Sequence, residues 1–150
     1  MASKKRSNKR EEKILDAYIK FSRAATSLEN QLSRNLIEKG LTFSQFSVME
    51  VVYHVGPLNQ KDIAFKILTS NSNLVTVIDN LEKNGLVRRE RGKEDRRNFI
   101  VHLTDKGRKM ISEIFLFHVQ LIVNRFDALT TREIEMLGSL SKKIGLNSGE

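Results

Sequence analysis

The sequence predicts a mainly helical protein with one small β-hairpin beyond its midpoint. Apolar residues recur at intervals of three and four along most of the chain, which is the spacing of helices that pack on a core. One segment, residues 86–103, instead alternates between apolar and charged residues and predicts two short strands. With 150 residues, 39% of them hydrophobic, the chain is long enough for one domain, which we expect at residues 11–150.

The chain begins with a basic segment, followed by a long predicted helix. Residues 1–10 offer too little apolar surface to fold, so we expect a disordered tail, which could also contact phosphates near DNA. Residues 11–39 predict a helix that Gly40 ends. Its heptad-like apolar seam requires a partner, either the rest of the chain or a second subunit. The seam comprises Ile14, Tyr18, Phe21, Ala25, Leu28 and Leu32.

Two shorter helices are expected next. Thr42 and Gln45 form a capping box that opens a helix reaching Val55, and this helix is apolar on most faces. Asn59 then caps a second short helix. We expect the inner side of this second helix to comprise Ile63, Ala64, Ile67 and Leu68.

The segment from Ser70 to Asn84 predicts a helix with two unlike faces, and Gly85 follows as a left-handed stop. Its apolar face comprises Leu74, Val77, Ile78 and Leu81, and its polar face comprises Asn71, Asn73, Thr76 and Asn80. A short helix followed by one with an outward polar face is typical of a helix-turn-helix, whose second helix fits the major groove of DNA.

The predicted hairpin is rich in arginine. We expect Val87, Phe99, Val101 and Leu103 to point inward and the basic residues to alternate outward, namely Arg88, Arg89, Arg91, Lys93, Arg96 and Arg97. At the tip, Asp95 could bridge Arg97 or an arginine at the start of the strand, so that Arg96 or Arg97 extends into a groove. A charged turn alone would be a solvated surface feature. After a helix-turn-helix, we favour contact with DNA.

Two further helices complete the chain. Thr104 is expected to cap a helix from Asp105 to about Asp127, and Thr130 with Glu133 predicts a capping box for the last one. The inner side of the last helix should be Ile134, Leu137, Leu140 and Ile144. We expect residues 147–150 to fray. Long apolar-striped helices at both ends of the chain suggest a dimer interface.

Composition narrows the function classes. The net charge of +8 favours a polyanionic partner, although a basic protein with nothing to bind is as compatible with charge alone. The absence of cysteine excludes disulfides and thiolate metal sites within this chain. No apolar run approaches the ~20 residues of a membrane helix, and no secretory signal is recognisable, so we expect a cytoplasmic protein.

Several ordered motifs resemble the MarR (multiple antibiotic resistance regulator) family of winged helix-turn-helix transcription factors. They are Leu41–Thr42 with Gln45, SNSNLVTVIDNLEKNGLVRRE at residues 70–90, and the wing EDRRNFIVHLTDKG at residues 94–107. The resemblance implies a mainly α fold with a small β-wing and N- and C-terminal dimerisation helices. It places these helices at residues 11–40 and 108–147 and a winged-helix DNA-binding lobe at residues 41–107.

The resemblance also implies a homodimer on a pseudo-palindromic operator, usually acting as a repressor. Many members of the family release DNA when a small phenolic or anionic ligand binds. Carried over by position, Asn71, Ser72, Asn73, Thr76 and Asn80 would face the major groove, while Arg97, braced by Asp95, would enter the minor groove. Arg88 and Arg96 complete the expected DNA-binding set.

The same sequence is compatible with other functions. Tyr18, Phe21, Tyr53, Phe115 and His118 could line a ligand pocket, although aromatic residues at helical spacing more often belong to a core. We expect no enzyme, no cofactor and no metal site, because the sequence has no phosphate-binding loop and no nucleophile with a recognisable base. A winged helix without a ligand, or one that binds proteins, remains an alternative.

Overall fold

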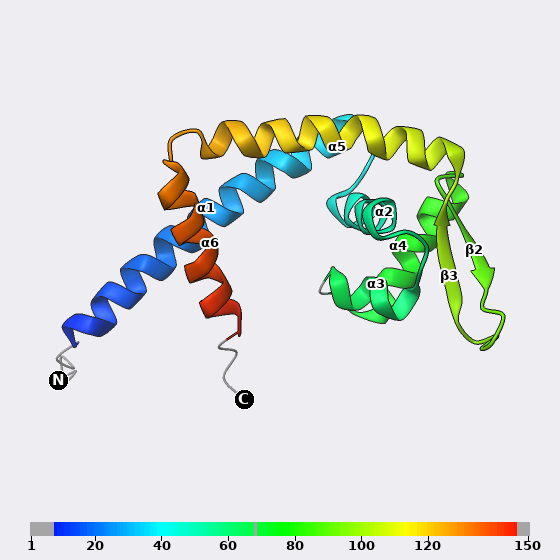
Figure 1. Ribbon diagram of the computed structural model, residues 1–150, viewed down its shortest axis with the longest axis horizontal. Helices are drawn as coiled ribbons and strands as arrows, with labels where there is room; N and C mark the ends of the chain where they lie inside the picture. The colour runs from blue at the N-terminus through cyan, green and yellow to red at the C-terminus, as the bar shows by residue number, and fades with distance from the viewer. Residues whose placement is uncertain (1–7, 68, 147–150) are drawn as a thin grey trace, which may run out of the picture.

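The computed structural model describes residues 8–67 and 69–146. A lobe of three helices and a small sheet lies at one end of a long arch, which is built by helices from both ends of the chain (Figure 1). The arch comprises α1 (Lys9–Glu38), α5 (Asp105–Phe126) and α6 (Thr131–Leu146). The lobe comprises α2 (Phe43–Val55), β1 (Leu58–Asn59), α3 (Gln60–Lys66), α4 (Asn71–Lys83), β2 (Val87–Arg91) and β3 (Phe99–Leu103).

The predicted helix caps are confirmed. The Thr42 hydroxyl accepts the Gln45 N–H at 3.1 Å while the Gln45 side chain accepts the Thr42 N–H at 2.9 Å, which is a complete capping box for α2. The predicted caps Asn59 and Thr104 each accept one backbone N–H at the start of α3 and α5, and Ser70, which was not predicted as a cap, does so at the start of α4. Such caps satisfy N–H groups that the helix itself leaves unpaired, so local sequence fixes where these helices begin.

The core of the lobe lies where α2, α4 and α5 meet the sheet. The apolar face predicted for α4 is buried, with Leu74, Ile78 and Leu81 fully enclosed. Gly85 has φ +71°, a left-handed conformation that a glycine adopts without steric cost, and it ends the helix as expected. The other large enclosed side chains are Leu36, Phe46, Val48, Met49, Val52, Ile63, Val87, Val101 and Ile111.

The sheet has one more strand than the sequence predicted. β2 and β3 pair as an antiparallel hairpin, and the short β1 adds to the free edge of β3, which gives the order β1-β3-β2. Leu58 pairs with Val101 and Asn59 with Ile100. A two-residue strand has no detectable alternation of its own, so only its partner reveals it.

Two expectations about the chain ends need correction. The helix α1 begins at Lys9, within the segment expected to be a disordered tail, because the Asn8 side chain accepts the Arg10 N–H at 3.1 Å and caps it. The expected inner side of α6 is also not covered by its own chain: Leu140 is 51% and Ile144 65% exposed. Residues 1–7, Leu68 and the expected frayed end at residues 147–150 lie outside the described residues.

Candidate nucleic-acid interface

The outer face of α4 is polar and accessible. Asn71, Ser72, Asn73, Thr76 and Asn80 are all exposed. The helical period turns Asn73, Thr76 and Asn80 away from Leu74, Ile78 and Leu81, which point into the core, whereas Asn71 and Ser72 are exposed in the first turn of the helix. The Ser70 hydroxyl accepts the Asn73 N–H at 3.3 Å and fixes the start of the helix. The structure therefore presents the five predicted major-groove residues along one surface. Amide and hydroxyl side chains in such a row can donate to and accept from base edges.

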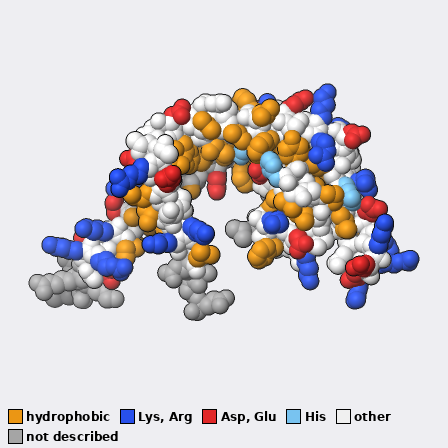
Figure 2. All heavy atoms as spheres, viewed as in Figure 1, with side chains coloured by type: hydrophobic (Ala, Val, Ile, Leu, Met, Phe, Trp, Pro, Cys, Tyr) orange, Lys and Arg blue, Asp and Glu red, His pale blue; other side chains and the backbone are white. Residues whose placement is uncertain are grey.

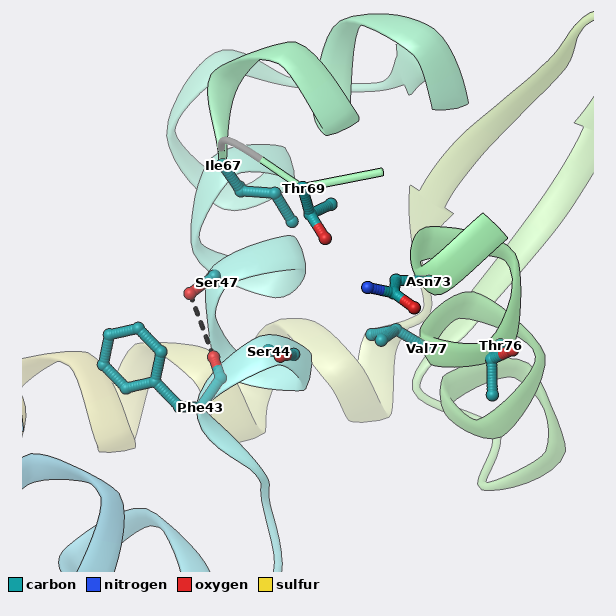
Figure 3. A pocket seen from close by; sticks show the side chains of 8 residues that line it. All are labelled: Phe43, Ser44, Ser47, Ile67, Thr69, Asn73, Thr76 and Val77. Atoms are coloured by element: carbon teal, nitrogen blue, oxygen red, sulfur yellow. Dashed lines mark hydrogen bonds between the residues drawn. The ribbon is translucent and has the colours of Figure 1, made fainter. Parts of the chain in front are cut away.

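A hollow of about 490 Å³ lies beside this face, between α4, the start of α2 and the end of α3 (Figure 3). Asn73 points into the hollow from α4, and Ser44 and Ser47 line its opposite wall. Ile67 and Val77 contribute apolar side chains to it. No sequence pattern marks Ser44 or Thr69 as site residues, because the hollow forms only where three helices pack together.

Asp95 holds the wing tip in a defined shape. Its carboxylate accepts the Arg97 N–H at 3.0 Å and lies 3.6 Å from the Arg97 guanidinium, as the sequence suggested. The Gly92 N–H donates to the Asn98 carbonyl at 2.8 Å and closes the loop. The Arg97 side chain is nevertheless 95% exposed. A fixed backbone thus carries an exposed guanidinium, which can enter a groove next to α4, the second helix of the helix-turn-helix and hence the candidate recognition helix.

The remaining wing residues are partly engaged within the wing. The guanidinium of Arg88 lies 3.4 Å from the Glu90 carboxylate, which also lies 3.1 Å from Nε2 of His102. The Arg88 side chain is still 57% exposed, and an exposed ion pair of this kind contributes little to stability. Arg96 is exposed at the tip. Both arginines remain accessible to a phosphate backbone.

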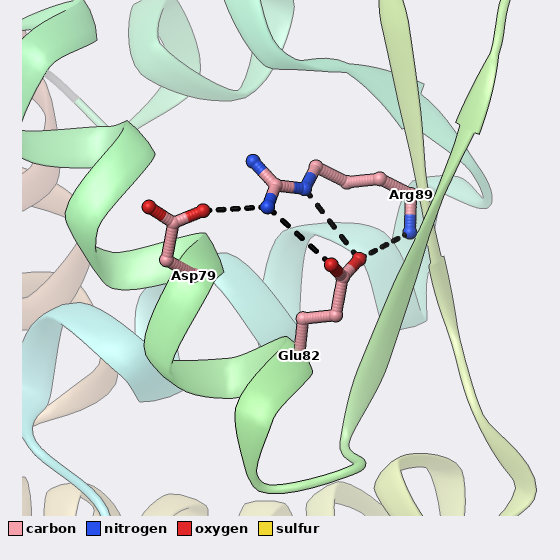
Figure 4. A network of polar contacts seen from close by, with 3 residues as sticks. All are labelled: Asp79, Glu82 and Arg89. Atoms are coloured by element: carbon pink, nitrogen blue, oxygen red, sulfur yellow. Dashed lines mark hydrogen bonds and ion pairs between the residues drawn. The ribbon is translucent and has the colours of Figure 1, made fainter.

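Arg89 departs from the expectation that the hairpin arginines alternate outward. It lies on the same strand face as the buried Val87, because side chains two residues apart share a face, and so it points back towards α4. Its guanidinium lies 2.5 Å from Asp79, and both its backbone N–H and its side chain contact Glu82 (Figure 4). Arg89 is only 23% exposed. The two-residue period from Val87 was the signal that could have identified it.

The five candidate pocket residues lie in different surroundings. The rings of Tyr53 and Phe115 are 6.4 Å apart, beside His54 and under the guanidinium of Arg108. His118 is instead buried against Phe46, with ring centroids 4.3 Å apart, and this burial lowers the pKa of His118.

The two candidates on α1 lie apart from that cluster. Tyr18 is 64% exposed, and Phe21 lines a separate groove between α1, α5 and α6.

That groove, of about 530 Å³, is mostly apolar. The hydrophobic side chains of α1, α5 and α6 form a broad exposed surface on the arch (Figure 2). Among the described residues, α6 contributes none to the buried core. A monomer rarely exposes so much contiguous apolar surface without a partner. The groove residues are Phe21, Ala24, Ala25, Leu28, Phe126, Leu129 and Leu137, with Arg125, Gly138 and Ser141.

Other kinds of site find no support in the described part of the chain. Within residues 8–67 and 69–146, no helix has the length and apolarity needed to cross a bilayer. In the same residues, His, Asp and Glu side chains do not gather in groups of three that could hold a metal ion. The polar face of α4 and the wing are thus the chemically distinctive surface of the lobe.

Comparisons with known proteins identify a family whose model matches the part of the chain that carries this surface. The model of the MarR family matches residues 41–99, which span the lobe from the start of α2 into the wing. The chain is 34% identical to the uncharacterised HTH-type transcriptional regulator YkoM of Bacillus subtilis over 137 residues, covering 91% of this chain and 89% of that protein. It is 32% identical to the HTH-type transcriptional regulator MhqR of the same organism, covering 91% of this chain and 94% of MhqR.

A solved structure extends the similarity to nearly the whole fold. Sco3205, a MarR family transcriptional regulator from Streptomyces coelicolor crystallised in complex with DNA, superimposes with a TM-score of 0.85 at 26% identity. The alignment covers 99% of this chain and 94% of that one. The six helices and the three-stranded wing are therefore a MarR winged-helix fold. The chain belongs to the MarR family of DNA-binding HTH-type transcriptional regulators, and is not an enzyme.

Proposed function

We propose that two copies of this chain bind a pseudo-palindromic operator in the cytoplasm and repress transcription. One observation carries the proposal: the exposed polar face of α4 lies on the same lobe as Arg97, whose side chain is 95% exposed on a braced loop. The helix would read base edges in the major groove while Arg97 enters the neighbouring minor groove. Arg88 and Arg96 would contact phosphates, which position the lobe without reading sequence.

The unpaired apolar surface of the arch supports the dimer. Leu137 and Leu140 of α6 and Tyr18 of α1 are exposed in the single chain, and each would be buried by a second copy of the same helices. A two-fold dimer presents two recognition helices, and its operator then repeats the same half-site in inverted order. Half-sites about one helical turn of DNA apart, or a multiple of it, are therefore expected.

The test begins with duplexes selected from a random pool by the purified protein. Arg97→Ala should weaken binding to the best duplex by about 1–3 kcal/mol, the range of other groove contacts. Arg132→Ala is the matched control, because Arg132 is exposed on α6 at the other end of the molecule (Figure 1). An Arg97→Ala titration that superimposes on the wild-type curve removes the wing from the mechanism.

The base-reading role of Asn73 needs a separate measurement. Asn73→Ala should change which bases are preferred when the selection is repeated, because an amide side chain contacts base edges with defined polarity. An equal loss of affinity on every duplex would instead make Asn73 a phosphate contact. A reporter carrying the selected operator between promoter and gene distinguishes repression from activation.

Release by a small phenolic or anionic ligand is the finer part of the proposal. It is supported by the Tyr53–Phe115 pair under Arg108, an aromatic surface with a cation beside it. A hydroxybenzoate titrated into the protein–duplex complex should release the DNA, and Tyr53→Ala should raise the concentration required. Unchanged duplex binding up to millimolar hydroxybenzoate would favour a regulator that does not respond to this class of ligand.

A further inference from the structure

The recognition helix carries two carboxylates close to its proposed DNA-binding face. Asp79 lies three residues beyond Thr76, and therefore beside it on the helix surface, and Glu82 follows one turn later. The Asp79 side chain is 52% exposed and that of Glu82 is 40% exposed. DNA carries one negative charge per ≈1.7 Å of its axis, so free carboxylates at this position oppose binding.

Arg89 contacts both carboxylates from the neighbouring strand (Figure 4). Its Nη2 lies 2.5 Å from Oδ1 of Asp79 and 3.4 Å from Oε1 of Glu82, and its Nε lies 3.5 Å from Oε2 of Glu82. The Arg89 backbone N–H donates a further bond of 2.8 Å to Glu82. One side chain of β2 is thus fixed to two positions of α4.

The contacts favour the charged forms of Glu82 and Arg89. The hydrogen bonds from Arg89 lower the pKa of Glu82. Burial would lower the pKa of Arg89, but its hydrogen bonds to Glu82 and Asp79 outweigh burial and raise it. A guanidinium keeps its charge at any physiological pH, and its planar fork suits two carboxylates at once. The network therefore places one cation between two carboxylates.

We infer that Arg89 is a positioning residue for DNA binding, which neutralises Asp79 and Glu82 on the recognition helix and fixes the wing strand against that helix, instead of contacting DNA. The inference rests on the proposed DNA-binding function. The exposed fractions of the arginines support it: 23% for Arg89 against 95% for Arg97. The ion-pair bridge fixes the orientation of the wing relative to α4. The two elements would then enter the major and minor grooves at a fixed angle to each other.

The experiment compares Arg89→Met with the triple variant Arg89→Met, Asp79→Asn, Glu82→Gln. Each is titrated with the selected duplex at several salt concentrations, alongside wild type and Arg97→Ala. Arg89→Met should weaken binding by at least about tenfold, because two uncompensated carboxylates then face the phosphates. The triple variant removes these charges and should recover the affinity lost through repulsion of the phosphates, with a salt dependence equal to that of the wild type. The affinity that it does not recover measures the loss of the fixed wing strand.

A direct phosphate contact makes the opposite prediction. The triple variant would then stay as weak as Arg89→Met, and the slope of log affinity against log salt would become shallower by about 0.9 for the lost contact. That result, or an Arg89→Met curve equal to wild type, overturns the inference. If wild type binds no selected duplex, the proposed function itself fails, which is a distinguishable outcome.

Loss of folding is controlled separately. Thermal unfolding of each variant shows whether Arg89→Met remains folded at the temperature of the titration. If it does not, Arg89→Lys keeps one charge without the planar fork and replaces it in the comparison. We expect the affinity of Arg89→Lys for the duplex to lie between that of wild type and that of Arg89→Met. Equal affinity of Arg89→Lys and wild type would contradict the fixing of the wing by the fork.

Discussion

The hydroxyl of Thr104 donates a 2.6 Å hydrogen bond to the carbonyl oxygen of Gly85, which is nineteen residues earlier in the chain. The same hydroxyl oxygen accepts the Gly107 N–H at 3.0 Å and so caps α5. The Thr104 N–H donates to the Leu86 carbonyl at 3.1 Å. One residue therefore joins the end of the recognition helix to the start of the long arch helix.

Removing this hydroxyl should destabilise the lobe. We expect Thr104→Val to lower the free energy of unfolding by about 2 kcal/mol, since both a helix cap and the partner of a carbonyl are lost. Thr130→Val is the matched control, because Thr130 only caps the exposed helix α6 and should cost about 1 kcal/mol. Urea unfolding at fixed protein concentration measures both, and equal losses would show that the bond to Gly85 adds nothing.

Gly107 permits the close approach of α5 to the turn after α4. A Cβ at this position would lie 1.9 Å from the carbonyl oxygen of Leu86, which is far inside contact distance. Gly107→Ala should therefore displace backbone and cost about 3 kcal/mol or more. Gly145→Ala serves as the control, because nothing lies within 4 Å of its added Cβ. The same urea experiment compares them, and a Gly107→Ala midpoint close to wild type would contradict the predicted clash.

His118 should make stability depend on pH. Burial against Phe46 lowers the pKa of His118 in the folded protein below its usual 6.5. The unfolded chain then binds a proton more readily, so the stabilising contribution is complete above about pH 6.5 and declines as the pH falls towards the folded pKa. His118→Leu should flatten this part of the profile of unfolding free energy between about pH 6.5 and 5. A slope unchanged by the substitution would mean that His118 titrates as it does in the unfolded chain.

The apolar face of α6 should be needed for assembly. Leu140→Glu places a charge where a second copy would bury a leucine. Burial of a leucine side chain contributes about 1.5–3 kcal/mol. Its loss should therefore raise the dimer dissociation constant by at least about tenfold. Phe65→Glu is the control, because Phe65 is 82% exposed on α3 in the lobe, away from the arch (Figure 1). Sedimentation equilibrium measures both variants. A wild-type protein that is monomeric at micromolar concentration would contradict the proposed interface.

Local patterns in the sequence determined the helices, their caps and the exposed polar surface of α4 that we propose reads DNA. Ser70 and Gly85 delimit α4 through hydrogen bonds and a backbone conformation that need no distant partner, and the spacing of Leu74, Ile78 and Leu81 fixes which face turns outward. The Asp95–Arg97 brace is likewise local, since its partners are two positions apart in the sequence. These features follow from the helical period and short-range hydrogen bonding.

Tertiary structure alone decided how those pieces meet. β1 exists only because β3 offers an open edge, and Arg89 reaches Asp79 only because β2 packs beside α4. The exposure of the apolar side of α6 could not be predicted from the sequence either. An apolar stripe indicates that a helix face is buried, but not whether its own chain or a second copy covers it. Sequence periodicity determines which face of a helix or strand a residue occupies. Which groups that face contacts is decided by packing between segments that are far apart in the chain.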